Sequence, residues 1–148
     1  MKVYLIMSGC GCPRGLNYVG EREVMSAADF LKGQKISPSH VHFLTSKEAV
    51  SVDSARIIKK ALGLAEPAVV NWLNRSAPAG DLWKEVKKFS DEDPNRSTFL
   101  VVSNVSVVEN VLSSFARRFE PSFEIITTKG SVHLVDTDAR TLAELFVP

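Results

Sequence analysis

The glycine-rich stretch 8–15 is the first part of the chain whose side chains could take part in a reaction. It follows a short apolar run. It contains the hydroxyl of Ser8, the thiols of Cys10 and Cys12, and the guanidinium of Arg14. A nucleophilic hydroxyl or thiol beside a cation is the combination that phosphoryl transfer uses. The stretch therefore indicates one of two sites: a covalent nucleophile, or backbone N–H groups that bind an anion without turnover.

A serine nucleophile needs a neighbouring base, and the chain contains three histidines that could supply one. His40 and His42 begin a predicted strand whose far end, at Thr45, lies on the side of the loop, which places both histidines roughly 10–15 Å away. His133 falls inside a late predicted strand, where a solvated or hydrogen-bonded structural histidine is the simpler interpretation. We therefore interpret Ser8 as a small polar loop residue.

Cys10 and Cys12 are one residue apart, and no second pair of Cys or His stands at metal-ligand spacing. We therefore expect free, partly exposed thiols, with no metal and no cofactor. Arg14 follows Cys10 after three residues and Cys12 after one. Neither spacing matches the Cys-x5-Arg pattern of cysteine-dependent phosphatases.

Anion binding without turnover is the second possibility. The backbone of Gly9, Cys10 and Gly11 can present N–H groups, and a helix predicted to begin near Ser106 directs its positive end to the same side. The alternative is a loop whose glycines only permit a tight exit from the strand, and both interpretations stay open. The candidate anion or ligand pocket consists of Ser8, Gly9, Cys10, Arg14, Lys47, Ser103 and Asn104.

Strands that alternate with helices are expected to position these residues. Hydrophobic periodicity predicts strands at 3–7, 40–45, 68–73, 98–103, 123–128, 131–136 and 141–147, with 123–128 and 131–136 forming a hairpin. It predicts helices from 21 to about 31, from about 51 to 62, from about 81 to 89 and from 106 to about 115. Gly33 is expected as a left-handed C-cap, and Ser106 with Glu109 as a capping box.

This order predicts an α/β fold: a three-layer α/β/α sandwich with a largely parallel central sheet and antiparallel strands toward the C-terminus. Ligands in such sheets bind beyond the carboxyl ends of the strands. The loops that start at Ser8, Thr45 and Ser103 should therefore share one edge of the sheet.

Composition restricts the class of protein. The 148 residues are 45% hydrophobic and 24% charged, and 18 basic side chains against 17 acidic ones give a net charge of +1. A protein with this charge balance has no strong positive electrostatic field to attract nucleic acid or an anionic membrane, so neither is expected as a partner. The apolar run Val3–Met7 is too short for a signal sequence. We expect one domain spanning 1–148, in the cytoplasm.

The order of several short motifs resembles the histidine phosphatases, and in particular the SixA-type phosphohistidine phosphatases. The opening MKVYLIMSG is similar to the family's first strand, which ends in Arg-His-Gly, and keeps its glycine as Gly9. The other similar segments, which extend over almost the whole chain, are Arg14-Gly15-Leu16, Gly20, 31–35, 44–46, Pro78-x-Gly80-Asp81, 101–103, 127–128 and 131–135.

The resemblance implies a phosphoglycerate mutase-like fold and phosphoryl transfer through a histidine nucleophile, two arginines and a second histidine. Carried over by position, the Arg-His pair falls on Met7 and Ser8, the second arginine on Val50 and the second histidine on Asn104. All four are replaced. A shift of a few residues would bring Arg56 nearer the loop, although helical spacing presents it to solvent.

Three hypotheses follow. The first is a catalytically inactive histidine-phosphatase-like protein that binds or regulates, with an unknown protein or a small phosphorylated ligand as partner. The second is an active phosphatase or phosphotransferase that uses Ser8 or Cys10 with Arg14, and its phosphatase form would act on phosphohistidine or a small phosphate ester. The third is a protein-interaction subunit whose cleft is filled.

Overall fold

The computed structural model describes residues 1–73, 79–93, 98–125 and 128–148. Its strands are β1 (Lys2–Met7), β2 (Gly11–Cys12), β3 (Gly15–Leu16), β4 (Val41–Thr45), β5 (Ala68–Val69), β6 (Thr98–Ser103), β7 (Val132–Asp136) and β8 (Thr141–Phe146). Its helices are α1 (Tyr18–Lys32), α2 (Ala49–Leu62), α3 (Ala79–Glu92) and α4 (Val105–Phe119), with 3-10 helices η1 (Pro38–His40) and η2 (Asn71–Leu73).

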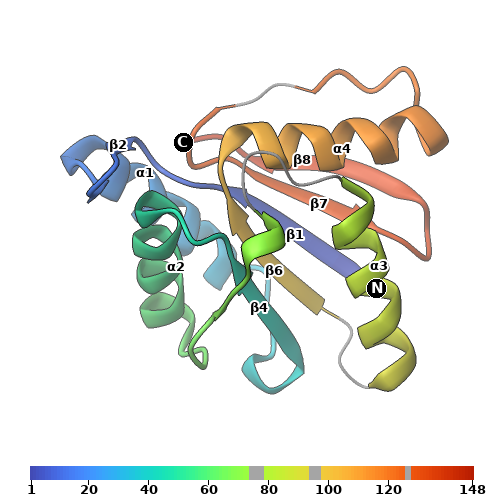
Figure 1. The fold of residues 1–148 in the computed structure, drawn as a ribbon, viewed down its shortest axis with the longest axis horizontal. Helices are drawn as coiled ribbons and strands as arrows, with labels where there is room; N and C mark the ends of the chain where they lie inside the picture. Colours follow the sequence, from blue (N-terminus) through green and yellow to red (C-terminus); the bar gives the residue numbers. More distant parts are fainter. Residues whose placement is uncertain (74–78, 94–97, 126–127) are drawn as a thin grey trace.

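A six-stranded mixed sheet in the order β5-β4-β6-β1-β7-β8 forms the centre of the molecule (Figure 1). The neighbours β5, β4, β6 and β1 pair in parallel, whereas β7 pairs antiparallel with both β1 and β8. The predicted α/β fold, with a largely parallel sheet and antiparallel strands near the C-terminus, is confirmed.

Two apolar layers cover the faces of this sheet. Val3, Leu5 and Met7 of β1 point to the layer shared with α3 and α4. Tyr4 and Ile6 point to the opposite layer, shared with α1 and α2. Alternation along a strand places successive side chains on opposite faces, so a continuous apolar run such as β1 belongs in the interior of a sandwich.

Two predicted strands differ in the structure. The stretch 68–73 contains only the two-residue β5 before the chain turns into η2. The predicted hairpin of 123–128 with 131–136 is wrong, because β7 pairs with β1 and β8, and residues 123–125 form no strand. Phe123 and Ile125 instead pack against the α3–α4 layer, while 126–127 lie outside the described residues.

The helix ends also differ. Asn17 caps α1, with its side chain accepting from Gly20 N at 2.8 Å, so this helix begins three residues before the predicted start. Gly33 has φ of −70° and is not left-handed, whereas Gly63 has φ of +65°. The predicted capping box at Ser106 is wrong, because Asn104 caps α4 and places Ser106 inside the helix.

The glycine-rich stretch contains a small hairpin that the sequence did not reveal. Cys12 pairs with Gly15, and Gly11 with Leu16. Gly15 has φ of +138°, and a Cβ there would lie 2.1 Å from Asp53 Oδ2, so this position requires glycine. Within the described ranges, no helix has the length and apolar character needed to cross a membrane.

Candidate functional site

The carboxyl ends of β1, β4 and β6 meet at one edge of the sheet, as predicted. Ser8 N donates to Ser103 O at 2.8 Å, and Ser46 N donates to Val102 O at 3.1 Å, so the loops leave the sheet side by side. A cavity of about 470 Å³ lies at this edge. Its lining includes Ser8, Gly9, Glu48, Val50, Asn104 and Lys129.

Two helices begin at this cavity. Ala49 and Val50 from the first turn of α2 line it, as do Val105 and Ser106 from the first turn of α4. The N-terminus of a helix carries a partial positive charge and backbone N–H groups without intrahelical partners. The cavity therefore has two of the features that attract anions.

Hydrogen bonds hold the first loop against α2. Gly9 N donates to Ser54 Oγ at 3.2 Å, and Ser54 Oγ donates to Val50 O at 2.6 Å. Leu16 N donates to Asp53 Oδ2 at 3.1 Å. The Gly9 N–H group is thus committed to the protein, which argues against its predicted role as an anion ligand.

Asn104, on which the resemblance places the family's second histidine, is 8% exposed. Its Oδ1 accepts from Val107 N at 3.1 Å and caps α4, while its Nδ2 donates to Glu48 Oε1 at 3.0 Å. Both ends of the amide are therefore occupied within the protein. The hydrogen bond to Glu48 also holds the Glu48 carboxylate near the N-terminus of α4.

The two residues on which the resemblance places the family's arginines, Met7 and Val50, are apolar. Met7 is 0% exposed and belongs to the core layer shared with α3 and α4 rather than to the cavity lining. Val50 lines the cavity and packs closely on the first loop, since a Cβ on Gly11 would lie 2.5 Å from its Cγ1. Neither position supplies the positive charge that stabilises the oxygens of a transferring phosphoryl group.

Four of the predicted pocket residues do not line the cavity. Arg14 and Lys47 are exposed outside it, and Ser103 is buried with its Oγ donating to Leu73 O at 3.0 Å. Cys10 hydrogen-bonds to Glu23, which together with burial raises the pKa of the thiol. The structure thus brings together Ser8, Gly9 and Asn104 of the predicted set.

The histidines lie elsewhere. The ring of His42 packs against both Phe89 and Phe99, with centroid distances of 4.4 and 4.8 Å. His133 is fully buried with Nε2 3.4 Å from Glu144 Oε2 across β7 and β8, and His40 ends η1 before β4. Among the described residues, those that line the cavity include no imidazole and no guanidinium, and no three potential metal ligands cluster together.

Sequence reasoning missed Glu48 and Lys129. The predicted helix began at about 51, and its true start at Ala49 makes Glu48 the residue that precedes the first turn. Lys129 reaches the cavity because Gly130 N donates to Met7 O at 3.1 Å and Met7 N donates to Ser131 O at 3.0 Å. A helix predicted to start directly after Ser46-Lys47-Glu48 would have placed Glu48 at this edge of the sheet. The position of Lys129 depends on strand pairing and has no comparable signal in the sequence.

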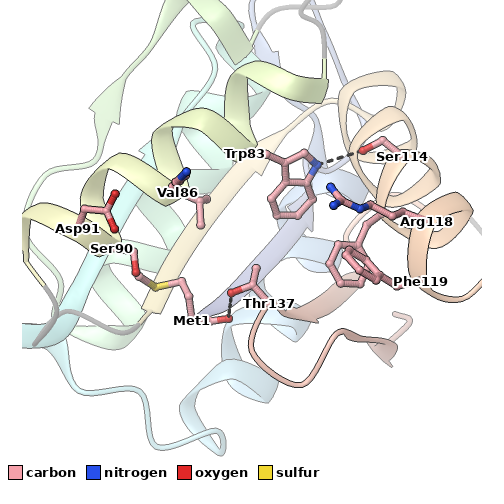
Figure 2. A pocket seen from close by; sticks show the side chains of 11 residues that line it. Met1, Trp83, Val86, Ser90, Asp91, Ser114, Arg118, Phe119 and Thr137 are labelled. Atoms are coloured by element: carbon pink, nitrogen blue, oxygen red, sulfur yellow. Dashed lines mark hydrogen bonds between the residues drawn. The ribbon is translucent and has the colours of Figure 1, made fainter.

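A second cavity, of about 430 Å³, lies between α3 and α4 near the start of β1, at the opposite edge of the sheet (Figure 2). Its lining includes Trp83 and Phe119 together with Met1. It is therefore separate from the site at the end of β1.

Neither a protein-family model nor a curated protein matches the sequence. Solved structures do match in fold: the chain has the phosphoglycerate mutase-like fold of the histidine phosphatases. The protein histidine phosphatase SixA, in a complex with tungstate, superimposes with a TM-score of 0.81 at 18% identity, covering 99% of this chain and 95% of that one.

Two further solved structures have the same fold. A protein from Agrobacterium tumefaciens assigned as the phosphohistidine phosphatase SixA gives a TM-score of 0.77 at 17% identity, covering 99% of this chain and 97% of its own. A protein from Escherichia coli assigned as an alpha-ribazole-5′-P phosphatase gives a TM-score of 0.67 at 14% identity, covering 98% of this chain and 94% of its own. The expected SixA-like fold is confirmed by these likenesses.

Proposed function

We propose that this chain is a single-domain protein with the histidine phosphatase fold that does not transfer phosphoryl groups, and that its cavity serves binding or regulation. The partner classes are a small phosphorylated ligand or another protein, and the expected compartment is the cytoplasm. The observation that carries the proposal is the hydrogen bond between Asn104 Nδ2 and Glu48 Oε1.

This contact opposes phosphoryl transfer in two ways. An imidazole at position 104 could hold or deliver a proton, whereas the Asn104 amide can do neither and is already bonded at both ends. The Glu48 carboxylate adds negative charge where the family fold receives a negatively charged group. Lys129 and the two helix N-termini still attract anions, so the cavity supports weak anion binding better than catalysis.

The proposal is tested by assaying the 148-residue chain with an aryl phosphate and with phosphohistidine. We expect turnover no higher than that of the Ser8→Ala variant. Loss of the nucleophile in a covalent enzyme costs on the order of a million-fold, so even weak genuine activity would separate the two proteins. Turnover that disappears in Ser8→Ala or Cys10→Ala would overturn the proposal.

Two observations weigh against an active site with displaced residues. The raised pKa of Cys10 disfavours the thiolate that would attack phosphorus. Arg14 lies outside the cavity lining and is exposed, so it is not positioned to stabilise a phosphoryl group there. The open volume of the cavity likewise does not support the hypothesis of a filled cleft.

A further inference from the structure

The cavity between α3 and α4 has an aromatic wall. The ring of Trp83 lies 5.7 Å from that of Phe115, and the ring of Phe115 lies 4.8 Å from that of Phe119, between centroids. All three residues line the cavity. Its volume of about 430 Å³ falls within the range of small-molecule sites, which are mostly apolar with a few polar groups.

This wall is held in place before any ligand arrives. Trp83 Nε1 donates to Ser114 Oγ at 3.0 Å, and Ser114 Oγ donates to Val111 O at 3.1 Å, which fixes the indole against α4. A ring that is already oriented loses little conformational entropy when it contacts a ligand.

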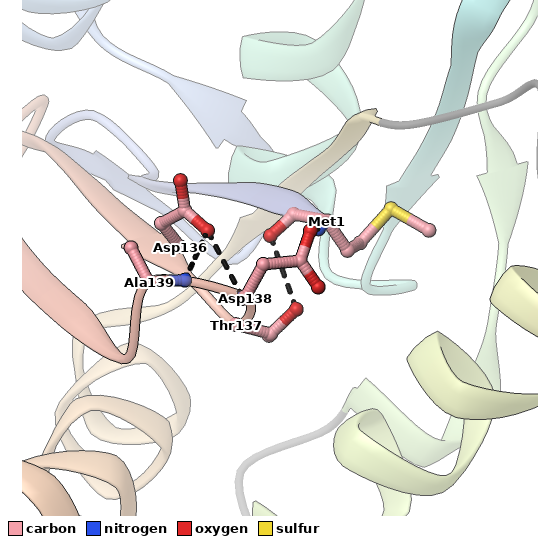
Figure 3. Close-up of polar contacts among 5 residues, drawn as sticks. All are labelled: Met1, Asp136, Thr137, Asp138 and Ala139. Atoms are coloured by element: carbon pink, nitrogen blue, oxygen red, sulfur yellow. Dashed lines mark hydrogen bonds and ion pairs between the residues drawn. The ribbon is translucent and has the colours of Figure 1, made fainter.

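The side of the cavity formed by Met1 is also fixed (Figure 3). Met1 O accepts from Thr137 Oγ1 at 3.2 Å and from Thr137 N at 2.9 Å, while the N-terminal ammonium pairs with Asp138. Asp136 Oδ1 accepts from the N–H groups of Asp138 and Ala139, both at 3.0 Å, and stabilises the turn. The cavity is therefore bounded by well-bonded backbone on this side.

Charge is unevenly distributed along the cavity. Arg118 lies beside Trp83 and Phe119 at one end, and its guanidinium carbon is 5.1 Å from the Phe119 centroid. Asp91 lies at the other end, near Ser90. Lys87 also lines the cavity, and among the described residues neither Lys87 nor Arg118 forms an ion pair.

We propose that this cavity binds a small aromatic carboxylate, with the ring against Trp83, Phe115 and Phe119 and the carboxylate at Arg118 and Lys87. The aromatic wall provides an apolar surface of rings tilted by 42° and 49° to their neighbours, which can contact an aromatic ligand by its face and its edge. The guanidinium beside it provides a planar donor that suits a carboxylate. The inference is independent of the proposed function, because this cavity and the one at the end of β1 lie at opposite edges of the sheet.

The test is a titration of the 148-residue chain with 1-naphthoate, observed through the indole N–H signal of Trp83 in NMR. We expect naphthoate to shift this signal in a saturable manner, and 1-naphthylmethylammonium, which has a similar ring and the opposite charge, to bind at least about fivefold more weakly. Absence of a naphthoate-dependent shift up to 10 mM, or equal binding of the two compounds, would overturn the proposal.

Two matched variants locate the contact. Arg117 and Arg118 are adjacent exposed residues in the last turn of α4, and only Arg118 lines the cavity. Arg118→Gln should weaken naphthoate binding about fivefold, whereas Arg117→Gln, with the same change of charge, should leave it unchanged. An equal loss of naphthoate affinity in both variants would show that only the net charge of the protein matters, and it would contradict the proposed site. A dimer in sedimentation that Trp83→Ala dissociates, together with no naphthoate-dependent shift, would instead identify a second copy of the chain as the occupant.

Discussion

Glu48 is the residue that most changes the character of the cavity, because it introduces a carboxylate between two helix N-termini. We predict that Glu48→Gln increases the affinity for inorganic phosphate about tenfold, since it removes a like charge near the bound anion. Isothermal titration calorimetry on the 148-residue chain measures the change in affinity. Glu92→Gln, an exposed site at the end of α3, is the control for net charge. Equal affinities for all three proteins would contradict the role given to Glu48.

The thiol of Cys10 is held in its neutral form by Glu23. A carboxylate that accepts from a thiol stabilises the protonated state, which is the direction of the raised pKa. We predict that Glu23→Gln lowers this pKa, so that alkylation by iodoacetamide at pH 8 becomes severalfold faster and its pH profile moves to lower pH. The comparison is made in a Cys12→Ser background, which leaves Cys10 as the only thiol. An unchanged pH profile would show that Glu23 does not control the thiol.

Met7 is the residue on which the resemblance places the family's first arginine. Its side chain is fully buried in an apolar layer. We predict that Met7→Arg lowers the free energy of unfolding by about 3–5 kcal/mol, because an unpaired charge would be buried. Met7→Leu should cost less than about 1.5 kcal/mol. Urea denaturation measures both, and a loss below about 1 kcal/mol for Met7→Arg would mean that the guanidinium reaches solvent or the cavity.

At the scale of elements, the start of α4 connects stability with the site. Asn104 caps the helix through Val107 N and also contacts Glu48, whereas Ser106 is exposed inside the first turn. We predict that Asn104→Ala lowers the free energy of unfolding by about 1–2 kcal/mol and that Ser106→Ala changes it by less than about 0.5 kcal/mol. Thermal and urea unfolding provide the values. A larger loss of unfolding free energy for Ser106→Ala than for Asn104→Ala would instead support the capping box expected from the sequence.

The helix termini also show where sequence patterns lose precision. Hydrophobic periodicity locates the buried face of a helix, and this placed the interiors of α1, α2 and α4 correctly. The caps depend on single side chains whose partners are fixed by backbone geometry. The sequence pattern predicted Ser106 as the cap, whereas the backbone of the β6–α4 connection places Asn104 there.

At the scale of the whole molecule, β1 is the most protected element because it pairs with β6 on one side and β7 on the other, between two apolar layers. We predict that its amides exchange with solvent more slowly than those of β8, which lies at an edge of the sheet. Native-state hydrogen exchange followed by NMR measures this order. Faster exchange in β1 than in β8 would indicate that the sheet opens from its centre.

The sequence by itself determined the fold class, because the apolar run of β1 and the alternation of strands and helices depend on local periodicity. It also determined that Met7, Ser8, Val50 and Asn104 carry neither imidazole nor guanidinium, since this is a matter of residue identity.

Only the tertiary structure decided what surrounds the site. Glu48 and Asn104 are 56 residues apart, and their contact exists because β4 and β6 end at the same edge and deliver both helix starts to it. Arg14 and Cys10 are close to Ser8 in the chain, yet the hairpin of β2 and β3 and the contact with Glu23 leave them outside the cavity lining. Side-chain direction in a loop follows from long-range packing, which no local pattern encodes.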